Sequence, residues 1–446
     1  MLAPAMNEVP KAVAGWQARI AEVLSVRYAL LRGWTAGSAL IAGLVQTFVF
    51  ARVLSPDRFS LFILVGAVGV SMWLFDLGLS KILFVRMRKH YLAGESTLGV
   101  GAQANAVALF YALAIVVFAA ICFATMLARP NETAWGAAEF ALFFFFSAIN
   151  LAWFVLRNVS VAVDQYIYFE TLEAVRRIGY IVLLLSMLAG LPFSVFVIVI
   201  NLGWVVLFGL AVRHLVRRGA LTLHLRGLAW RLGEFFRENW QSALRTGTHA
   251  GGEIYIHNVL YLVVPVAAGL GAPTIIVDTA LKIFLGTLNL CSAACDLLVP
   301  RQTAAFAARN ARLLWRTTLT AVALCAVPAL IVSALLLFDA KGLFAILLGR
   351  SATMPPAAAP ILLVLLATAA IKSAPNFLLQ HTGYFRAIAR LSIFNVALMT
   401  AAVVTGLLLH SDVVGFLALY AGTFVVVAAL YVTLAVRGPL RDTAKT

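Results

Sequence analysis

The chain has 446 residues, of which 63% are hydrophobic, well above the roughly 45 to 50% of a soluble globular domain. This composition excludes a soluble enzyme or binding module and indicates a polytopic membrane protein. The formal net charge is +16, but the arginines cluster between apolar segments. They therefore fit the orienting charges of membrane loops and not a nucleic-acid-binding surface.

The two ends of the chain and its cysteines add little chemistry. Residues 1–29 form an amphipathic segment that lacks the short apolar core and cleavage site of a signal peptide. The four cysteines all lie inside apolar runs. This placement predicts small core residues, with no disulfide framework and no zinc or other metal site.

Apolar runs of about 20 residues predict twelve transmembrane helices. They lie near residues 30–52, 59–83, 98–127, 136–157, 170–189, 194–213, 247–267, 275–298, 316–338, 356–375, 391–409 and 413–435.

The region between the sixth and seventh spans divides the chain. Residues 214–246 have a basic amphipathic pattern, which predicts an interfacial helix. It separates an N-terminal six-helix lobe, 30–213, from a C-terminal six-helix lobe, 247–435, which a tail at 436–446 follows. Because six is even, the two lobes share one orientation, as in a parallel repeat. We therefore expect an all-α fold with the two lobes around a central cavity.

Loop charges predict the orientation, because Lys and Arg accumulate on the cytoplasmic side of a membrane. Both chain ends and the loops that follow even-numbered spans hold most of these residues. Both termini are therefore expected in the cytoplasm. The opposite loops hold Arg52, Arg58, Arg129, Lys341 and Arg350.

The eighth predicted span carries a polar stripe on a lipid-length helix. At about 100° per residue, the stripe occupies a sector about 80° wide. Charges in a span cost roughly 2.5 to 3.5 kcal/mol each, so this face should meet either a partner helix or a solute pathway. Asp278 and Lys282, four residues apart, either neutralise each other or open when an anionic solute competes for the lysine. The stripe contains Asp278, Lys282, Asn289, Ser292 and Asp296.

The seventh predicted span has a second polar face. Glu253 lies between His249 and His257 at helical spacing. An isolated histidine on such a face is usually a hydrogen-bonded packing residue. An intramembrane carboxylate is a candidate protonatable site, so Glu253 is our first candidate for H⁺ or Na⁺ coupling.

Four further charged residues lie within or at the ends of predicted spans. Asp76 and Lys81 are expected on one helix but about 140° apart, so they should seek different partners. Arg52, at an outer helix end, either snorkels to headgroups or lines the cavity. Lys372 has the same two interpretations at an inner end. The cavity candidates for substrate are Lys282, Arg52, Lys81, Lys372, Asn289, His249 and His257, and those for coupling or gating are Glu253, Asp278, Asp76 and Asp296.

Catalytic signatures are absent from the sequence. It contains no Walker loop, no metal-ligand spacing and no soluble segment long enough for a nucleotide-binding fold. We therefore expect a protein that is not an enzyme and has no cofactor. A membrane glycan polymerase or ligase is the least favoured alternative, since the outer loops are short.

Three strings resemble a known transporter family: ARVLSPDRFSLF at 51–62, FDLGLSK at 75–81 and QHTGYFRAI at 380–388. They are similar to the polysaccharide-transport branch of the multidrug/oligosaccharidyl-lipid/polysaccharide (MOP) superfamily. Ser60 departs from the glycine often found there. Arg52 and Asp76 lie within the matched strings, whereas the candidates in spans seven and eight do not.

The resemblance implies a flippase in a bacterial inner membrane. Such a protein would export undecaprenyl-pyrophosphate-linked oligosaccharide, an O-antigen, capsule or exopolysaccharide repeat unit, by alternating access. Its expected partners are membrane lipids and the glycosyltransferases and polymerase of the same pathway, with the transporter itself a monomer. A cation-coupled exporter of small molecules from the same superfamily is the alternative. Counting Asp76, Glu253 and Asp278 against three intramembrane lysines leaves the choice open.

Overall fold

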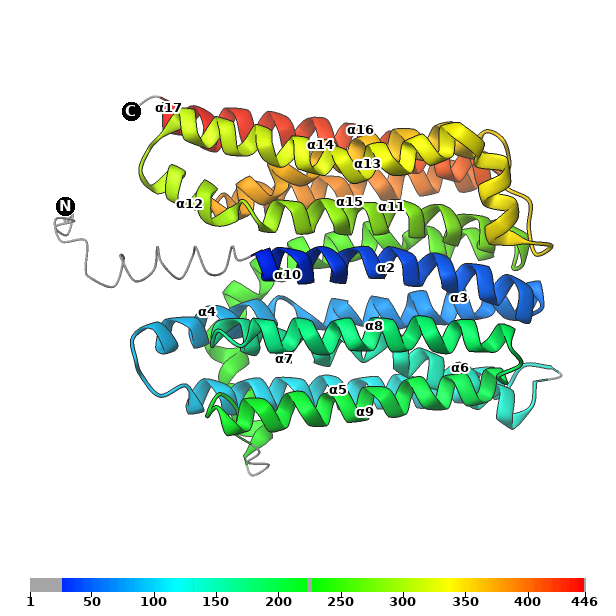
Figure 1. The fold of residues 1–446 in the computed structure, drawn as a ribbon, viewed down its shortest axis with the longest axis horizontal. Helices are drawn as coiled ribbons and strands as arrows, with labels where there is room; N and C mark the ends of the chain where they lie inside the picture. Colours follow the sequence, from blue (N-terminus) through cyan, green and yellow to red (C-terminus); the bar gives the residue numbers. More distant parts are fainter. Residues whose placement is uncertain (1–25, 131, 223–226, 445–446) are drawn as a thin grey trace.

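The computed structural model describes residues 26–130, 132–222 and 227–444, and its regular elements are all helices. Figure 1 shows them side by side along one long axis. The expected amphipathic segment at 1–29 lies almost wholly outside the described residues. The all-α fold class of the prediction is confirmed.

The first group of helices follows the N-terminal half of the chain. It comprises α2 (Val26–Val53), α3 (Pro56–Ser71), the 3-10 helix η1 (Met72–Asp76), α4 (Leu79–Leu92), α5 (Leu98–Leu127), α6 (Ala134–Ala148), α7 (Asn150–Ala162), α8 (Tyr166–Leu188) and α9 (Phe193–Arg217).

The second group follows the C-terminal half. It comprises α10 (Leu228–Ala267), α11 (Ala272–Asp296), α12 (Val299–Ala307), α13 (Ala311–Leu348), α14 (Ala358–His381), α15 (Phe385–Leu408), α16 (Val413–Ala435), the π-helical turn η2 (Val436–Leu440) and α17 (Arg441–Ala444).

Eleven helical segments of the described chain are long and apolar enough to cross a membrane. The one expected span that is not among these eleven is the fifth, 170–189. It corresponds to α8 (Tyr166–Leu188), which has 23 residues. It falls outside the eleven because its first half carries four charges. These charges are Glu170, Glu173, Arg176 and Arg177.

The second span ends earlier than expected. Residues 59–83 were predicted as one helix, but Leu77 (φ 45°) and Gly78 (φ 75°) adopt left-handed backbone conformations that interrupt it. The span therefore ends at Asp76, and Lys81 lies on a separate helix, α4. The angle of about 140° predicted between Asp76 and Lys81 assumed one continuous helix and was wrong.

The interfacial helix and the seventh span form one element. Helix α10 runs without a break for 40 residues, and its first proline, Pro265, lies in the last turn. The helix continues through 246/247, and its membrane-spanning segment, Gly247–Ala267, has the bounds expected for the seventh span. Residues 223–226 of the predicted interfacial segment lie outside the described part of the chain, and the domain limits 30–213 and 247–435 stay predictions.

Several helix pairs join the two groups, and at two of them a glycine allows a close approach. Helix α2 packs against α11, where a Cβ atom on Gly286 would lie 2.4 Å from Cδ1 of Leu40. Helix α10 packs against α3 and η1, where a Cβ on Gly247 would lie 3.0 Å from Cα of Leu77. Each pair thus uses a glycine at a close approach. Figure 1 shows α2 between the two groups.

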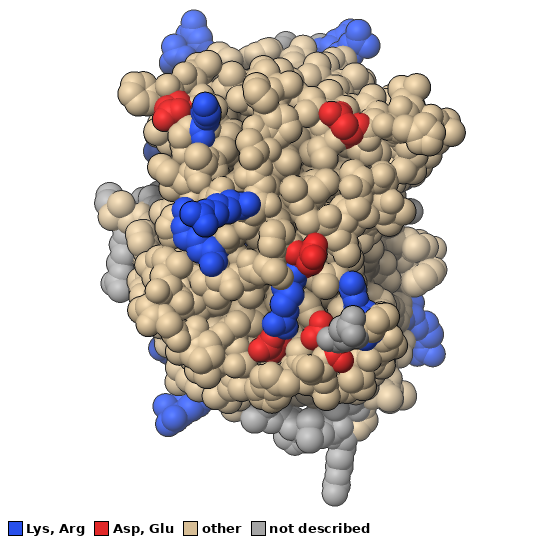
Figure 2. All heavy atoms as spheres, turned by 90° about the vertical axis from the view of Figure 1, so that its right-hand side faces the viewer, with Lys and Arg blue, Asp and Glu red and all other residues tan. Residues whose placement is uncertain are grey.

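Charge is distributed unevenly between the two ends of the helical stack. Helix α2 begins and α17 ends at the same end, on the left of Figure 1. Figure 2 views the opposite end, which is mostly uncharged with a few small groups of charge. We call the left end the basic end, because the Lys- and Arg-rich connections lie there. Its assignment to the cytoplasm stays a prediction.

Candidate functional site

The carboxylate of Glu253 lies in a cluster built by three helices of the second group. The ammonium of Lys372 on α14 lies 3.1 and 2.9 Å from the two carboxylate oxygens. Tyr431 on α16 donates a hydrogen bond of 3.4 Å to Oε1, and Nε2 of His257 lies 3.7 Å from Oε2. Sequence reasoning treated Glu253 and Lys372 as separate candidates, and the fold brings them together.

Lys372 does not snorkel. The residue is 2% exposed, and its ammonium lies 5.3 and 5.4 Å from the ring centroids of Phe424 and Tyr431. The Glu253 side chain is 19% exposed. Because separating a buried pair leaves an uncompensated charge, the two residues act as a unit.

The two histidines of α10 have different surroundings. Nδ1 of His249 lies 2.7 Å from Oγ of Ser392, and its Nε2 lies 3.4 Å from the amide of Gln380. His257 stacks on Phe424 with centroids 6.0 Å apart. Its buried Nε2 has no hydrogen-bond partner among the described residues. His249 is thus a packing residue with hydrogen bonds, whereas Nε2 of His257 is available to form a hydrogen bond beside Glu253.

Asp278 and Lys282 form the second buried ion pair, on α11. Their charged atoms lie 2.7 Å apart, and the ammonium also donates to Thr47 on α2 at 3.1 Å. Asp278 is 3% exposed. Of the two interpretations given for this pair, the described state corresponds to mutual neutralisation. Lys282 is placed against α2, so the pair also bridges the two groups.

The remaining stripe residues follow α11 toward the basic end. Asn289 is exposed, and Ser292 donates within its own helix to Leu288 at 2.9 Å. Asp296 accepts two hydrogen bonds from Arg32, at 3.1 and 2.9 Å. This ion pair joins the last residue of α11 to α2. The stripe therefore includes two charge contacts between the groups, one at mid-helix and one at the end.

Asp76 stabilises the start of α4. It accepts hydrogen bonds from the backbone N–H of Ser80 at 3.1 Å, from the Ser80 hydroxyl, and from the Tyr111 hydroxyl at 3.0 Å. The residue is buried. All three donors reach the same carboxylate oxygen, Oδ1. These hydrogen bonds tie Asp76, the last residue of η1, to the first turn of α4 across the interruption at Leu77 and Gly78.

Lys81 follows this break on α4 and is exposed. The carboxylates of Asp76 and Glu253 act on its ammonium electrostatically, and Lys81 in turn acts on His249 and His381. Of the four residues that interact with Lys81 in this way, Glu253, His249 and His381 belong to the second group. Its side chain therefore lies in the electrostatic field between the groups, and none of the described carboxylates comes within ion-pair distance.

Arg52 joins α2 to the other end of the second group. Its guanidinium donates to the carbonyls of Phe48 (2.8 Å) and Ile346 (2.7 Å). It also lies 3.7 Å from the Phe48 ring centroid. Nearby, Ser351 donates to the carbonyl of Ala51 at 2.7 Å. Arg52 is exposed, but its hydrogen bonds make it a bridge between α2 and α13.

A cavity of about 210 Å³ lies between the groups. Gln46 and Ser147 line it from the first group, and Tyr261, Asp278 and Lys282 line it from the second. Three phenylalanines complete an amphipathic wall. This volume is below the roughly 300 to 1,000 Å³ of a typical small-molecule site. The phenylalanines are Phe62, Phe143 and Phe146.

Comparison with known proteins identifies the fold. No family model matches the sequence, and no curated protein matches it. A solved structure of MATE in complex with MaL6 aligns over 94% of this chain and 96% of its own, with a TM-score of 0.63 and 15% identity. The chain has the MATE-like fold of the MOP superfamily transporters.

Two further solved structures agree with this fold. An outward-facing multidrug resistance MATE family transporter of the MOP superfamily aligns over 94% of this chain and 96% of its own, with a TM-score of 0.59 and 16% identity. A MOP superfamily transporter from Pyrococcus furiosus, described as having a reverse polarity of its binding pocket, aligns over 94% of this chain and 96% of its own. Its TM-score is 0.58 and its sequence identity is 14%. At these identities the likeness concerns the fold.

Within the MOP fold, the first group contains a charge cluster that sequence reasoning missed. Glu170 accepts from Arg157 at 3.1 Å and from Thr35 on α2 at 2.9 Å. Glu173 accepts from Arg176 and, at 3.0 Å, from Arg177. The signal was available, because these charges follow i, i+3 and i+4 spacing in α8. The arginines were nevertheless counted with the cytoplasmic segment 157–177, which overlaps the predicted span 170–189.

Proposed function

We propose that the chain is a transporter that moves a lipid-linked anionic glycan across a bacterial inner membrane. The substrate class is undecaprenyl-pyrophosphate-linked oligosaccharide, and both termini face the cytoplasm. The MOP fold supports transport as the activity. The sequence strings near Arg52 and Asp76 support the polysaccharide branch, and the charge balance described next supports an anionic substrate.

One observation carries the proposal. The carboxylates between the groups have partners among the described residues, whereas one lysine is exposed and forms no ion pair there. Glu253 is paired with Lys372, Asp278 with Lys282, and Oδ1 of Asp76 accepts from hydroxyl and backbone donors. Lys81 is exposed and has no ion pair among the described residues. The two ion pairs remove two acids and two lysines from the count, which leaves Asp76 and Lys81; Asp76 is buried and Lys81 is exposed, so Lys81 is the charge that a ligand can reach. A pyrophosphate is attracted to such a charge.

The small volume of the central cavity requires a conformational change. A volume of about 210 Å³ is too small for an oligosaccharide, given the roughly 300 to 1,000 Å³ of ordinary ligand pockets. The two groups must therefore separate along α2/α11 or along α3/α10. The ion pair Arg32–Asp296 joins the groups at the basic end, and the Arg52–Ile346 hydrogen bond joins them at the other. Breaking one of these contacts at a time gives alternating access.

The pair of Glu253 and Lys372 supplies a coupling device. A proton on Glu253 removes the negative charge and leaves a buried, unpaired ammonium, which is strongly unfavourable. The helices α10 and α14 must then shift to hydrate Lys372 or to find it another partner. Proton binding and helix movement are thereby linked.

The proposal is tested by deleting the gene and extracting the lipids. We expect undecaprenyl-linked repeat units to accumulate at the inner face, and surface glycan to fall. Normal surface glycan without accumulation would contradict the proposal. Neighbouring genes for glycosyltransferases and a polymerase would support it.

A second candidate, a cation-coupled exporter of small molecules, is favoured by the likeness to a multidrug resistance MATE family transporter. It predicts that the deletion strain becomes sensitive to organic cations while its surface glycan is unchanged. The occupied carboxylates place it second, because a cation would have to displace a lysine from Glu253 or Asp278.

A further inference from the structure

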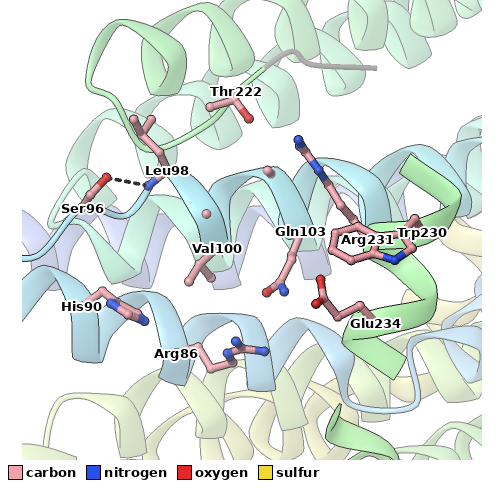
Figure 3. A pocket seen from close by; sticks show the side chains of 12 residues that line it. Arg86, His90, Ser96, Leu98, Val100, Gln103, Thr222, Trp230, Arg231 and Glu234 are labelled. Carbon is pink, nitrogen blue, oxygen red and sulfur yellow. Dashed lines mark hydrogen bonds between the residues drawn. The ribbon is translucent and has the colours of Figure 1, made fainter. Parts of the chain in front are cut away.

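A second and larger cavity lies at the basic end, where α4 and α5 of the first group meet the start of α10, apart from the central cavity. Its volume is about 550 Å³. The N-terminal turn of α5, the middle and end of α4, and the first turns of α10 line it (Figure 3). None of the candidates in the central cavity lines it, so the cavity belongs to a different site.

The wall of this cavity is cationic. Arg231 on α10 has no ion pair among the described residues. Arg86 on α4 forms an ion pair of 3.0 Å with Glu238, which does not line the cavity, and His90 lies 2.6 Å from Glu95. Glu234 is the one acidic residue in the lining. The two arginines line the cavity from two helices, with Arg231 directed to the side of Thr222 and Arg86 on the side of Gln103 (Figure 3); arginine side chains are suited to binding a phosphate group.

Two buried polar atoms in the lining are unsatisfied. Oε1 of Gln103 and Oγ1 of Thr222 have no hydrogen-bond partner among the described residues. Figure 3 shows the Gln103 side chain directed into the space between Arg86, Arg231 and Glu234. A buried polar group without a partner costs roughly 1 to 3 kcal/mol, so these atoms favour a ligand that brings hydroxyl groups.

The first turn of α5 adds a further anion-binding feature. The capping residue Thr97 donates its hydroxyl to the carbonyl of Gly219 at 3.2 Å and makes no side-chain cap. Leu98, Gly99 and Val100 line the cavity. The N–H of Leu98 donates to Oγ of Ser96 at 3.4 Å, so the N–H groups of Gly99 and Val100 are the ones that open the helix toward a ligand. Uncapped N–H groups at a helix start attract phosphate oxygens. This feature reinforces the arginines.

The mouth of the cavity is apolar. Trp230 is 67% exposed and Leu98 is 45% exposed, and both line the cavity. Tryptophan is enriched where a membrane protein meets the headgroup region. A ligand with a charged head and an acyl tail would therefore find a polar chamber and an apolar exit in one place.

We propose that this cavity binds the headgroup of an anionic phospholipid that carries hydroxyl groups, of the phosphatidylglycerol type. The phosphodiester accepts from Arg231, from Arg86 and from the α5 N-terminus. The headgroup hydroxyls donate to Gln103 and exchange hydrogen bonds with Thr222. The acyl chains leave past Trp230 and Leu98. Because the cavity joins α4 and α5 to the start of α10, the bound lipid stabilises the contact between the two groups at this end.

The test uses the purified full-length chain in phosphatidylcholine nanodiscs with phosphatidylglycerol added. Native mass spectrometry counts the bound lipid, and thermal unfolding measures the stabilisation. We expect Arg231→Gln to weaken phosphatidylglycerol binding about fivefold, the effect of one lost surface charge contact. Arg237→Gln, on the same helix but outside the lining, is the matched control and should bind as the wild type does.

Three results would overturn the proposal. Equal losses in both arginine variants would mean attraction to the overall charge and not to the cavity. Inorganic phosphate or glycerol phosphate that stabilised the chain as well as the lipid would assign the site to a free anion. Gln103→Leu should reduce the preference for phosphatidylglycerol over phosphatidic acid, and an unchanged preference would contradict the hydroxyl contact. Unfolding in phosphatidylcholine alone verifies that each variant folds. None of these results depends on the transported substrate.

Discussion

The ammonium of Lys372 lies 2.9 Å from a carboxylate oxygen of Glu253, although the two residues are 119 positions apart in the chain. Helices α14 and α10 bring them together, and Tyr431 on α16 completes the contact. The pair is the most deeply buried charge contact of the second group that joins separate helices. We expect it to control both stability and transport, for different reasons.

Glu253→Gln should lower the free energy of unfolding by about 3 kcal/mol, because it leaves the ammonium of Lys372 buried and unpaired. The double variant Glu253→Gln/Lys372→Met should regain most of this stability, since an apolar replacement of a buried pair is often neutral. Transport should be lost in both variants. Denaturant unfolding and glycan export measure the two effects, and transport in the double variant at wild-type rate would remove the coupling role.

Lys81→Gln should weaken the anionic substrate about fivefold, the effect of roughly 1 kcal/mol from one charge contact. Lys89→Gln is the matched control, because Lys89 is an exposed lysine on the same helix. Export of repeat units in vesicles is measured for both variants, and we expect a loss in Lys81→Gln alone. If Lys89→Gln were equally impaired, the effect would belong to the general charge of α4.

Gly286→Ala should separate α2 from α11, since the added Cβ would lie 2.4 Å from Cδ1 and 2.9 Å from Cβ of Leu40. Overpacking of this kind costs about 1 to 3 kcal/mol. Leu40→Ala in the same chain should restore part of the loss by making room. Gly422→Ala, on α16 with nothing within 4 Å, should unfold at the wild-type temperature. A Gly286→Ala variant as stable as this control would show that the helices are less tightly packed than described.

Reversing one charge of the Arg32–Asp296 pair should open the contact at the basic end. The two side chains are 17% and 31% exposed, so water screens the pair and its contribution should be about 1 kcal/mol. Arg32→Asp and Asp296→Arg should each raise the labelling rate of a cysteine placed between α2 and α11. The double reversal should return that rate toward the wild-type value, and additive effects of the two changes would exclude a direct contact.

Much of the architecture follows from the sequence, because it depends on local properties of the chain. Apolar runs of about 20 residues located the membrane helices, since the bilayer core requires that length. The polar faces of α10 and α11 were visible from helical periodicity, including Glu253 and Asp278. The errors were local as well. Leu77 and Gly78 break a run that hydropathy reads as continuous, and the charges of α8 were assigned to a loop.

Tertiary structure alone decided which charges meet. Periodicity places Glu253 on a face but says nothing of Lys372, because partner choice depends on how α10, α14 and α16 pack. Periodicity placed Asp278 beside Lys282 on one helix but left open whether the two pair, and the fold adds Thr47 of α2 as a second partner of the lysine. The consequence for function is that the acids of the interface are occupied while Lys81 is available. That difference arises from contacts between distant segments, which no local pattern encodes.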